Sequence, residues 1–125
     1  MALSLTQTDA VERLLKPGMR VASFGYPDII APIKWTKGLE YREDSEAICK
    51  RHNLKPHPIP DAHSYFKLKG CEFWVYDVVK ERGCEIECDL NQSIQFLPRY
   101  DIALDVGTAE HCFNIGQALI NMASG

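Results

Sequence analysis

The residues most able to do chemistry lie in one short cluster between a predicted strand and a predicted helix. Asp105, Thr108, Glu110 and His111 end or follow the apolar run Asp101–Val106. Ligand crevices in open α/β sheets lie outside the carboxyl ends of the strands. Histidine is the side chain most easily tuned to accept a proton near neutral pH, so His111, with Glu110 beside it, could orient or deprotonate a substrate. The alternative is that Glu110 and His111 cap the following helix or bind backbone.

Two further acidic positions end predicted strands. Asp77 follows the apolar run Phe73–Tyr76, and Asp89 ends an alternating run and precedes Leu90 and Asn91. A carboxylate presents two acceptor oxygens, so an acid at such a strand end can accept hydrogen bonds from the vicinal hydroxyls of a ribose. Each position also has a structural alternative. Asp77 could be an exposed strand-end acid or a helix cap, and Asp89 could close its strand in an Asx turn.

The cysteines and histidines do not form a metal-binding pattern. The chain has five cysteines and no CxxC motif. On a strand, Cys84 and Cys88 would point to the same face about 13 Å apart, which is too far to share a tetrahedral zinc with bonds of about 2.3 Å. The histidines His52, His57 and His63 lie in an irregular segment without a recognisable ligand spacing. We therefore expect no metal site, and we expect the cysteines to be small buried residues in a reducing compartment.

Four short apolar runs predict the strands that would position these residues. They are Met19–Phe24, Cys71–Val79, Cys84–Leu90 and Asp101–Val106. Cys71–Val79 is almost continuously apolar, which is typical of a central parallel strand. Cys84–Leu90 alternates acidic and apolar residues, which favours an edge strand with one wet face. The runs predict an α/β fold with a parallel sheet of about four strands and flanking helices.

Two segments in the first half of the chain have helical patterns. Thr8–Leu15 has an apolar face, and Thr6 or Thr8 can cap it. Ser45–His52 is a second candidate helix, with Asp44 as its cap.

The last helix is predicted over Asn114–Ala123, directly after the chemical cluster. It is amphipathic, because apolar residues recur at helical spacing along one side. The side that we expect to pack on the sheet carries Ile115, Ala118, Leu119 and Met122. The sequence therefore predicts a strand, a polar cluster and a helix in succession, the order that a parallel α/β sheet needs at its ligand-binding edge.

Two of these segments together resemble a known family. A helix, Lys16-Pro17-Gly18, a strand and Gly25 follow one another near the N-terminus, and Glu110–His111 precedes Asn114 and the helical Ala118–Leu119. This pattern resembles the N-terminal half of the class I S-adenosylmethionine-dependent methyltransferases, which are Rossmann-like. The resemblance implies that the four strands lie side by side in the order third, second, first, fourth, all parallel.

The resemblance also implies a role for each candidate residue, with S-adenosylmethionine as cofactor. Gly25 and Tyr26 occupy the place of the glycine-rich turn beside the methionine part of the cofactor, and Asp77 would hold the ribose. Asp89 and Leu90 would lie near the adenine amino group. The cofactor-binding positions are thus Gly25, Tyr26, Asp77, Asp89, Leu90 and Asp105, and His111 and Glu110 would act on the substrate. The single Gly25 departs from the usual glycine-x-glycine turn, so we expect weak cofactor binding.

The family continues with three further strands where this sequence ends, so a second reading stands beside the first. The first is a methyltransferase acting on a small molecule or sugar-like acceptor. The second is a non-catalytic α/β module that serves assembly or regulation. In either case Asp101–Val106 would be an open sheet edge, which recruits other chains. We therefore expect a homo-oligomer with Asp101–Met122 at or near the interface.

Length and composition set the remaining limits. A chain of 125 residues suits one domain, here 1–125 with an irregular, proline-rich insertion over about 29–70, in which His57–Gly70 should be mainly loop. The net charge of −3 provides no broad basic field for nucleic acid. No apolar run approaches the roughly 20 residues that span a bilayer, and the N-terminus lacks a secretory signal, so we expect a cytoplasmic protein without a membrane partner.

Overall fold

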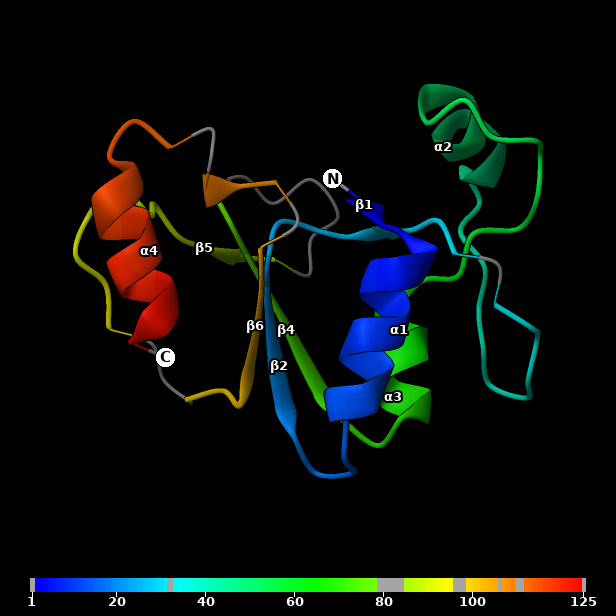
Figure 1. The fold of residues 1–125 in the computed structure, drawn as a ribbon, viewed down its shortest axis with the longest axis horizontal. Coiled ribbons are helices and arrows are strands. Elements are labelled where there is room, and N and C mark those ends of the chain that lie inside the picture. The colour runs from blue at the N-terminus through cyan, green and yellow to red at the C-terminus, as the bar shows by residue number, and fades with distance from the viewer. Residues whose placement is uncertain are drawn as a thin grey trace.

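The chain forms an α/β fold with helices on both faces of a parallel sheet (Figure 1). The computed structural model describes residues 2–31, 33–78, 85–95, 99–105, 107–109 and 112–124. The elements in chain order are β1 (Ala2–Leu3), α1 (Leu5–Leu14), β2 (Arg20–Phe24), β3 (Asp28–Ile29), α2 (Ser45–Arg51), α3 (Ala62–Leu68), β4 (Glu72–Asp77), β5 (Ile86–Glu87), β6 (Ile102–Asp105) and α4 (Ile115–Ala123).

The main sheet has four parallel strands in the order β5-β4-β2-β6. This confirms the predicted order of the third, second, first and fourth strands. β2 lies between β4 and β6, where Val21 pairs with Phe73 on one side and with Ile102 on the other. A separate pair, β1 and β3, is also parallel. Residues from Val21 to Phe24 are all buried, as a central parallel strand requires.

The two faces of the sheet have separate cores. On one face, α1 and α3 contribute Val11 and Phe66 to a cluster with Val21 and Val75. On the other face, α4 packs on a cluster that contains Phe24. Figure 1 shows α4 on the opposite side of the sheet from α1 and α3. Because side chains alternate along each strand, the same strands supply both cores.

The first helix begins earlier than the sequence pattern predicted. α1 starts at Leu5, and Ser4 is its cap. Ser4 Oγ accepts a hydrogen bond from the Gln7 backbone N–H at 3.3 Å, while Gln7 Oε1 accepts one from the Ser4 N–H at 3.0 Å. This capping box satisfies two donors at once. The predicted start at Thr8, with Thr6 or Thr8 as cap, is therefore wrong, and Thr8 is buried inside the helix.

The prediction that His57–Gly70 is mainly loop is also wrong, because α3 spans Ala62–Leu68. The Asp61 carboxylate caps α3 by accepting a hydrogen bond from the Ser64 N–H at 3.2 Å. Burial of Phe66, which stacks on a ring of β4, stabilises so short a helix.

The second helix lies close to its predicted range, but its predicted cap does not form. α2 spans Ser45–Arg51, with Asp44 at the N-cap position. The Asp44 side chain makes no hydrogen bond to the helix backbone. Its carboxylate binds the Arg42 guanidinium instead, with Nη2–Oδ2 at 2.9 Å. The carboxylate at this position therefore binds a side chain two residues before it in the chain rather than the helix terminus.

The last helix is confirmed, but only part of its predicted inward side is buried. Ala118 and Met122 are buried, whereas Ile115 and Leu119 are 49% and 53% exposed. The reason is Asn121, whose buried side-chain amide donates to the backbone carbonyls of Leu90 and Gln92 at 3.0 and 2.6 Å. These hydrogen bonds turn the Asn121 side of α4 inward, so part of the apolar stripe faces outward.

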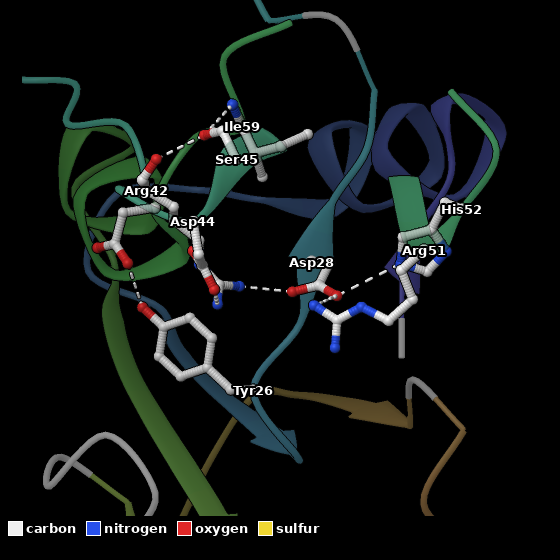
Figure 2. A network of polar contacts seen from close by, with 9 residues as sticks. Tyr26, Asp28, Arg42, Asp44, Ser45, Arg51, His52 and Ile59 are labelled. Atoms are coloured by element: carbon white, nitrogen blue, oxygen red, sulfur yellow. Dashed lines mark hydrogen bonds and ion pairs between the residues drawn. The ribbon is translucent and has the colours of Figure 1, made fainter. Parts of the chain in front are cut away.

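A buried ion pair joins the turn after β2 to the irregular segment (Figure 2). The side chains of Asp28 and Arg42 are only 7% and 6% exposed, and Arg42 Nη1 lies 2.5 Å from Asp28 Oδ1. His52 Nε2 lies 3.3 Å from Asp28 Oδ2. Arg51 reaches the same oxygen at 3.8 Å from a largely exposed position. Asp28 therefore anchors the end of α2 as well as Arg42.

Further contacts extend this network to the start of α3. The Arg42 guanidinium lies over the Tyr26 ring, 5.4 Å from its centroid. The Tyr26 hydroxyl donates to the Asp61 carboxylate, which caps α3. Ser45 Oγ donates to the Arg42 carbonyl at 2.5 Å and accepts from the Ile59 N–H at 2.9 Å. Polar contacts thus tie the interior of the irregular segment to Tyr26 and Asp28, which follow β2.

We expect Arg42→Ala to destabilise the fold by about 3–5 kcal/mol, because it leaves the Asp28 carboxylate buried without its main counter-charge. Arg51→Ala removes an exposed contact to the same carboxylate and should cost only about 0–1 kcal/mol. Urea denaturation of both variants measures the difference. The double variant Asp28→Leu with Arg42→Met should recover much of the loss. Equal stabilities for Arg42→Ala and Arg51→Ala would contradict a central role for the buried pair.

Candidate functional site

A pocket of about 550 Å³ lies at the carboxyl ends of β4 and β5. The segment that follows β6 forms another part of its wall. Three of the predicted cofactor-binding residues, Asp77, Asp89 and Leu90, line this pocket. Thr108, from the predicted chemical cluster, lines it as well. The parallel sheet brings these residues together, because the carboxyl ends of its strands meet at one edge.

Asp77 ends β4 and is held in place by its own turn. Its Oδ1 atom accepts a hydrogen bond from the Val78 N–H at 2.7 Å. Its second oxygen, Oδ2, makes no hydrogen bond with any residue that the structure describes. The side chain is partly buried in the pocket wall. Asp77 therefore presents a fixed carboxylate with one uncommitted oxygen.

Asp89 and Leu90 form the next part of the wall. Asp89 Oδ1 accepts hydrogen bonds from the Asn91 backbone N–H at 3.0 Å and from its side-chain amide at 3.1 Å. This is the Asx turn that the sequence left open as an alternative for Asp89. Leu90 is 4% exposed and packs in the core beneath the pocket. Asn91 Oδ1 accepts from the Asn114 N–H at 2.6 Å, which ties this wall to the start of α4.

Asp105 lies beside the pocket rather than in its wall, and it shapes the turn after β6. Its Oδ1 atom accepts hydrogen bonds from the backbone N–H groups of Gly107, Thr108 and Ala109, at 3.3, 2.8 and 3.2 Å. Gly107 has a φ of +100°, a backbone conformation that favours glycine. The Thr108 hydroxyl donates to the Phe24 carbonyl. These contacts hold Gly107 and Thr108 in the pocket wall.

Gly25 and Tyr26 are both buried, and neither is part of the pocket wall. Gly25 has a φ of +93°, and its N–H donates to the Tyr76 carbonyl at 2.9 Å. The Tyr26 ring lies beneath the Arg42 guanidinium, and its hydroxyl donates to the Asp61 carboxylate. The turn after β2 therefore faces the irregular segment.

The predicted catalytic pair, Glu110 and His111, lies outside the described residues. Cys112, the next residue along the chain, lines the pocket. Among the described residues, no group of three His, Cys, Asp or Glu side chains could hold a metal ion. In the same part of the chain, no helix is both long and apolar enough to cross a membrane.

Sequence reasoning missed five residues of the wall, Tyr76, Val78, Cys88, Gly107 and Cys112, of which the two cysteines are the most reactive by type. Burial, with the Asp89 charge beside it, raises the pKa of the Cys88 thiol to about 11. Burial also raises the pKa of Cys112, whose thiol donates to the Thr108 carbonyl at 3.5 Å. Both thiols are therefore protonated at neutral pH and act as weakly polar wall groups. The signal in the sequence was their adjacency to Asp89 and to the Glu110–His111 pair.

The charge of the described wall is negative. It contains two carboxylates, Asp77 and Asp89, and no lysine or arginine. Such a wall favours a neutral or cationic ligand and repels phosphate groups.

Comparison of the chain with protein-family models, with curated proteins and with solved structures gave no match. The class of protein that the structure itself defines is an α/β fold with a parallel four-stranded sheet and a pocket at its carboxyl edge.

The raised pKa of Cys88 predicts slow thiol chemistry. We expect the rate of its alkylation by iodoacetamide to rise about tenfold per pH unit up to pH 10, because the thiolate is the reactive form. The same cysteine in the unfolded chain should level off near its ordinary pKa of 9.0. Peptide mass spectrometry after timed labelling measures both rates. A plateau below pH 10 in the folded protein would show that the thiol is not held in its protonated form.

Proposed function

We propose that this pocket binds the nucleoside part of S-adenosylmethionine and that the chain is a methyltransferase acting on a small molecule or sugar-like acceptor. One observation carries the proposal: Asp77 and Asp89, from the ends of successive strands of a parallel sheet, border the same pocket. These are the positions that the family resemblance assigns to the ribose and to the adenine. The proposal therefore rests on the sequence pattern and on pocket geometry that agrees with it.

The pocket suits such a ligand in size and charge. A volume of about 550 Å³ lies within the range of about 300–1,000 Å³ typical of small-molecule sites. The free Asp77 oxygen can accept a hydrogen bond from a ribose hydroxyl. Two carboxylates without a neighbouring lysine or arginine in the described wall fit a sulfonium cation better than a nucleotide phosphate.

The chain's own residues would have two tasks in the reaction. Bound S-adenosylmethionine supplies a methyl group that an acceptor nucleophile attacks, with cleavage of the carbon–sulfur bond. Asp77, Asp89 and Leu90 would hold the nucleoside in place. His111, with Glu110 beside it in the sequence, would orient the acceptor or accept the proton that it loses, since histidine serves as a general base near neutral pH.

Calorimetry with S-adenosylhomocysteine tests cofactor binding directly. We expect a dissociation constant in the micromolar range or weaker, equivalent to about −8 kcal/mol at best, because Gly25 replaces the usual glycine-rich turn. Asp77→Ala should weaken binding by about 1.5–3 kcal/mol, the scale of a hydrogen bond to a charged acceptor. Asp77→Asn should have a smaller effect because it keeps one acceptor.

The matched control is Glu72→Ala, which removes an exposed carboxylate from the other end of β4. It should leave binding unchanged. Adenosine monophosphate should bind more weakly than S-adenosylhomocysteine, since its phosphate would approach two carboxylates. Unchanged affinity in a folded Asp77→Ala variant would remove the ribose assignment, and absence of any binding would remove the cofactor.

A second candidate function is assembly, and the outer surface of α4 favours it. Phe113, Ile115, Leu119 and Ile120 are 99%, 49%, 53% and 61% exposed, and α4 carries no charged residue. Among the described strands, β6 pairs only with β2, so its other edge is open. An exposed apolar surface beside an open strand edge is typical of an interaction site. We propose that this surface, Phe113–Ile120 with β6, forms a homo-oligomer.

Sedimentation equilibrium at micromolar concentration tests the assembly. We expect a dimer or larger species for the parent chain, and a shift toward monomer for Leu119→Glu, which places a charge in the contact. Leu14→Glu is the matched control, because Leu14 is a similarly exposed leucine on α1, on the other face of the sheet. A parent chain that remains a 14.2 kDa monomer would exclude this role.

A further inference from the structure

A hollow of about 460 Å³ lies between α1, α3 and residues 33–39. It is on the face of the sheet that α1 and α3 cover, and the Tyr65 hydroxyl joins these helices by donating to the Glu12 carboxylate. The hollow shares no lining residue with the pocket at the carboxyl edge of the sheet. An inference about this hollow therefore does not depend on the proposed function.

The lining of the hollow is positively charged. Lys34 and Lys37 line it from the irregular segment, and Lys69 lines it directly after α3. Lys34 and Lys37 form no ion pair with any residue that the structure describes. Both lysines are exposed, so a ligand in the hollow can reach their ammonium groups.

The one acid among the described lining residues, Glu12, is already paired. Its Oε1 atom accepts a hydrogen bond from the Tyr65 hydroxyl and lies 3.3 Å from Lys69 Nζ. The hydrogen bond from Tyr65 lowers the pKa of Glu12, so the carboxylate is ionised at neutral pH and balances the charge of Lys69. The charges of Lys34 and Lys37 remain, although the chain as a whole carries a net charge of −3.

Most of the remaining lining is apolar. Ile33, Leu39, Tyr65 and Leu68 contribute to it. Leu39 and Tyr65 belong to the core on this face of the sheet, whereas Leu68 is 42% exposed and presents accessible apolar surface. The hollow thus combines accessible apolar surface with two ammonium groups that have no counter-charge among the described residues.

We propose that this hollow binds a small amphipathic carboxylate, in which an anionic head group is joined to an apolar chain. The head group would accept charge-assisted hydrogen bonds from Lys34 and Lys37. The chain would lie against Ile33 and Leu68, which removes apolar surface from water. The volume of about 460 Å³ is within the range of about 300–1,000 Å³ that is typical of small-molecule sites. Charge complementarity selects this occupant, because a cationic amphiphile would be repelled by both lysines.

Calorimetry and amide NMR of the full chain with sodium octanoate, used as the monomer, test the proposal. We expect saturable binding with a dissociation constant of about 1 mM or a few times that value, as suits a small ligand with few contacts. The amide resonances of Thr36, Lys37 and Leu68 should shift. Acetate lacks the chain and octanol lacks the charge, so each should bind at least about tenfold more weakly.

The double variant Lys34→Glu with Lys37→Glu should weaken octanoate binding at least about tenfold, because it places two carboxylates beside the head group. The matched control is Lys50→Glu with Lys55→Glu. It changes the net charge equally, at two exposed lysines outside the hollow, and should bind octanoate like the parent. Leu68→Ser should weaken binding about threefold or more and reduce the gain in affinity from hexanoate to octanoate.

The parent chain alone can overturn the proposal, whether or not the variants fold. Absence of saturable octanoate binding would do so, and so would octylammonium binding as tightly as octanoate. Shifts confined to the exposed surface of α4 would assign the chain of the ligand to that surface instead. Binding to phosphatidylglycerol vesicles without binding of monomeric octanoate would indicate a membrane-binding surface and would also exclude the proposed site. Equal affinities of the two folded double variants would show that Lys34 and Lys37 do not hold the head group.

Discussion

The buried Asp28–Arg42 ion pair is the contact on which the arrangement of the chain depends. After β2 the chain leaves the sheet and returns only at β4, with α2 and α3 between them. Polar contacts from Arg42, Arg51 and His52 converge on Asp28, and apolar clusters pack the rest of this connection. A carboxylate that is 7% exposed is costly to bury unless it is paired, so these partners can occupy few other positions.

This constraint also decides which strand ends form the pocket. Because the network draws Tyr26 and Asp28 toward the irregular segment, the turn after β2 does not reach the pocket wall. The ends of β4 and β5 and the turn after β6 form the wall instead. The described wall of the pocket therefore consists of these strand ends and this turn, without the backbone that follows β2.

The sequence predicted the sheet well because its strands are short apolar runs with few alternatives. It failed where a single tertiary or local contact decides the outcome. α3 exists because Asp61 caps it and Phe66 is buried, and α4 is rotated because Asn121 binds the backbone around Leu90. In the site, Asp77 and Asp89 were predictable from their place after strands. For Cys88 and Cys112 the sequence offered only their adjacency to Asp89 and to Glu110–His111, because a partly buried cysteine has the same sequence signature whether it lines a pocket or fills a core.

The three acids at the strand ends differ in how far the fold already uses them. Asp105 Oδ1 accepts three backbone hydrogen bonds and fixes the turn after β6. Asp89 Oδ1 accepts two from Asn91 and closes the Asx turn. Asp77 Oδ1 accepts one, from the adjacent Val78 N–H. Each donor fixes the orientation of a carboxylate and uses part of its capacity to accept hydrogen bonds. Asp77, with one donor, therefore has a fixed orientation and the greatest remaining capacity to accept further hydrogen bonds. The same residue type at equivalent strand ends thus fixes a turn at one edge of the sheet and leaves a carboxylate oxygen facing no described donor near its centre.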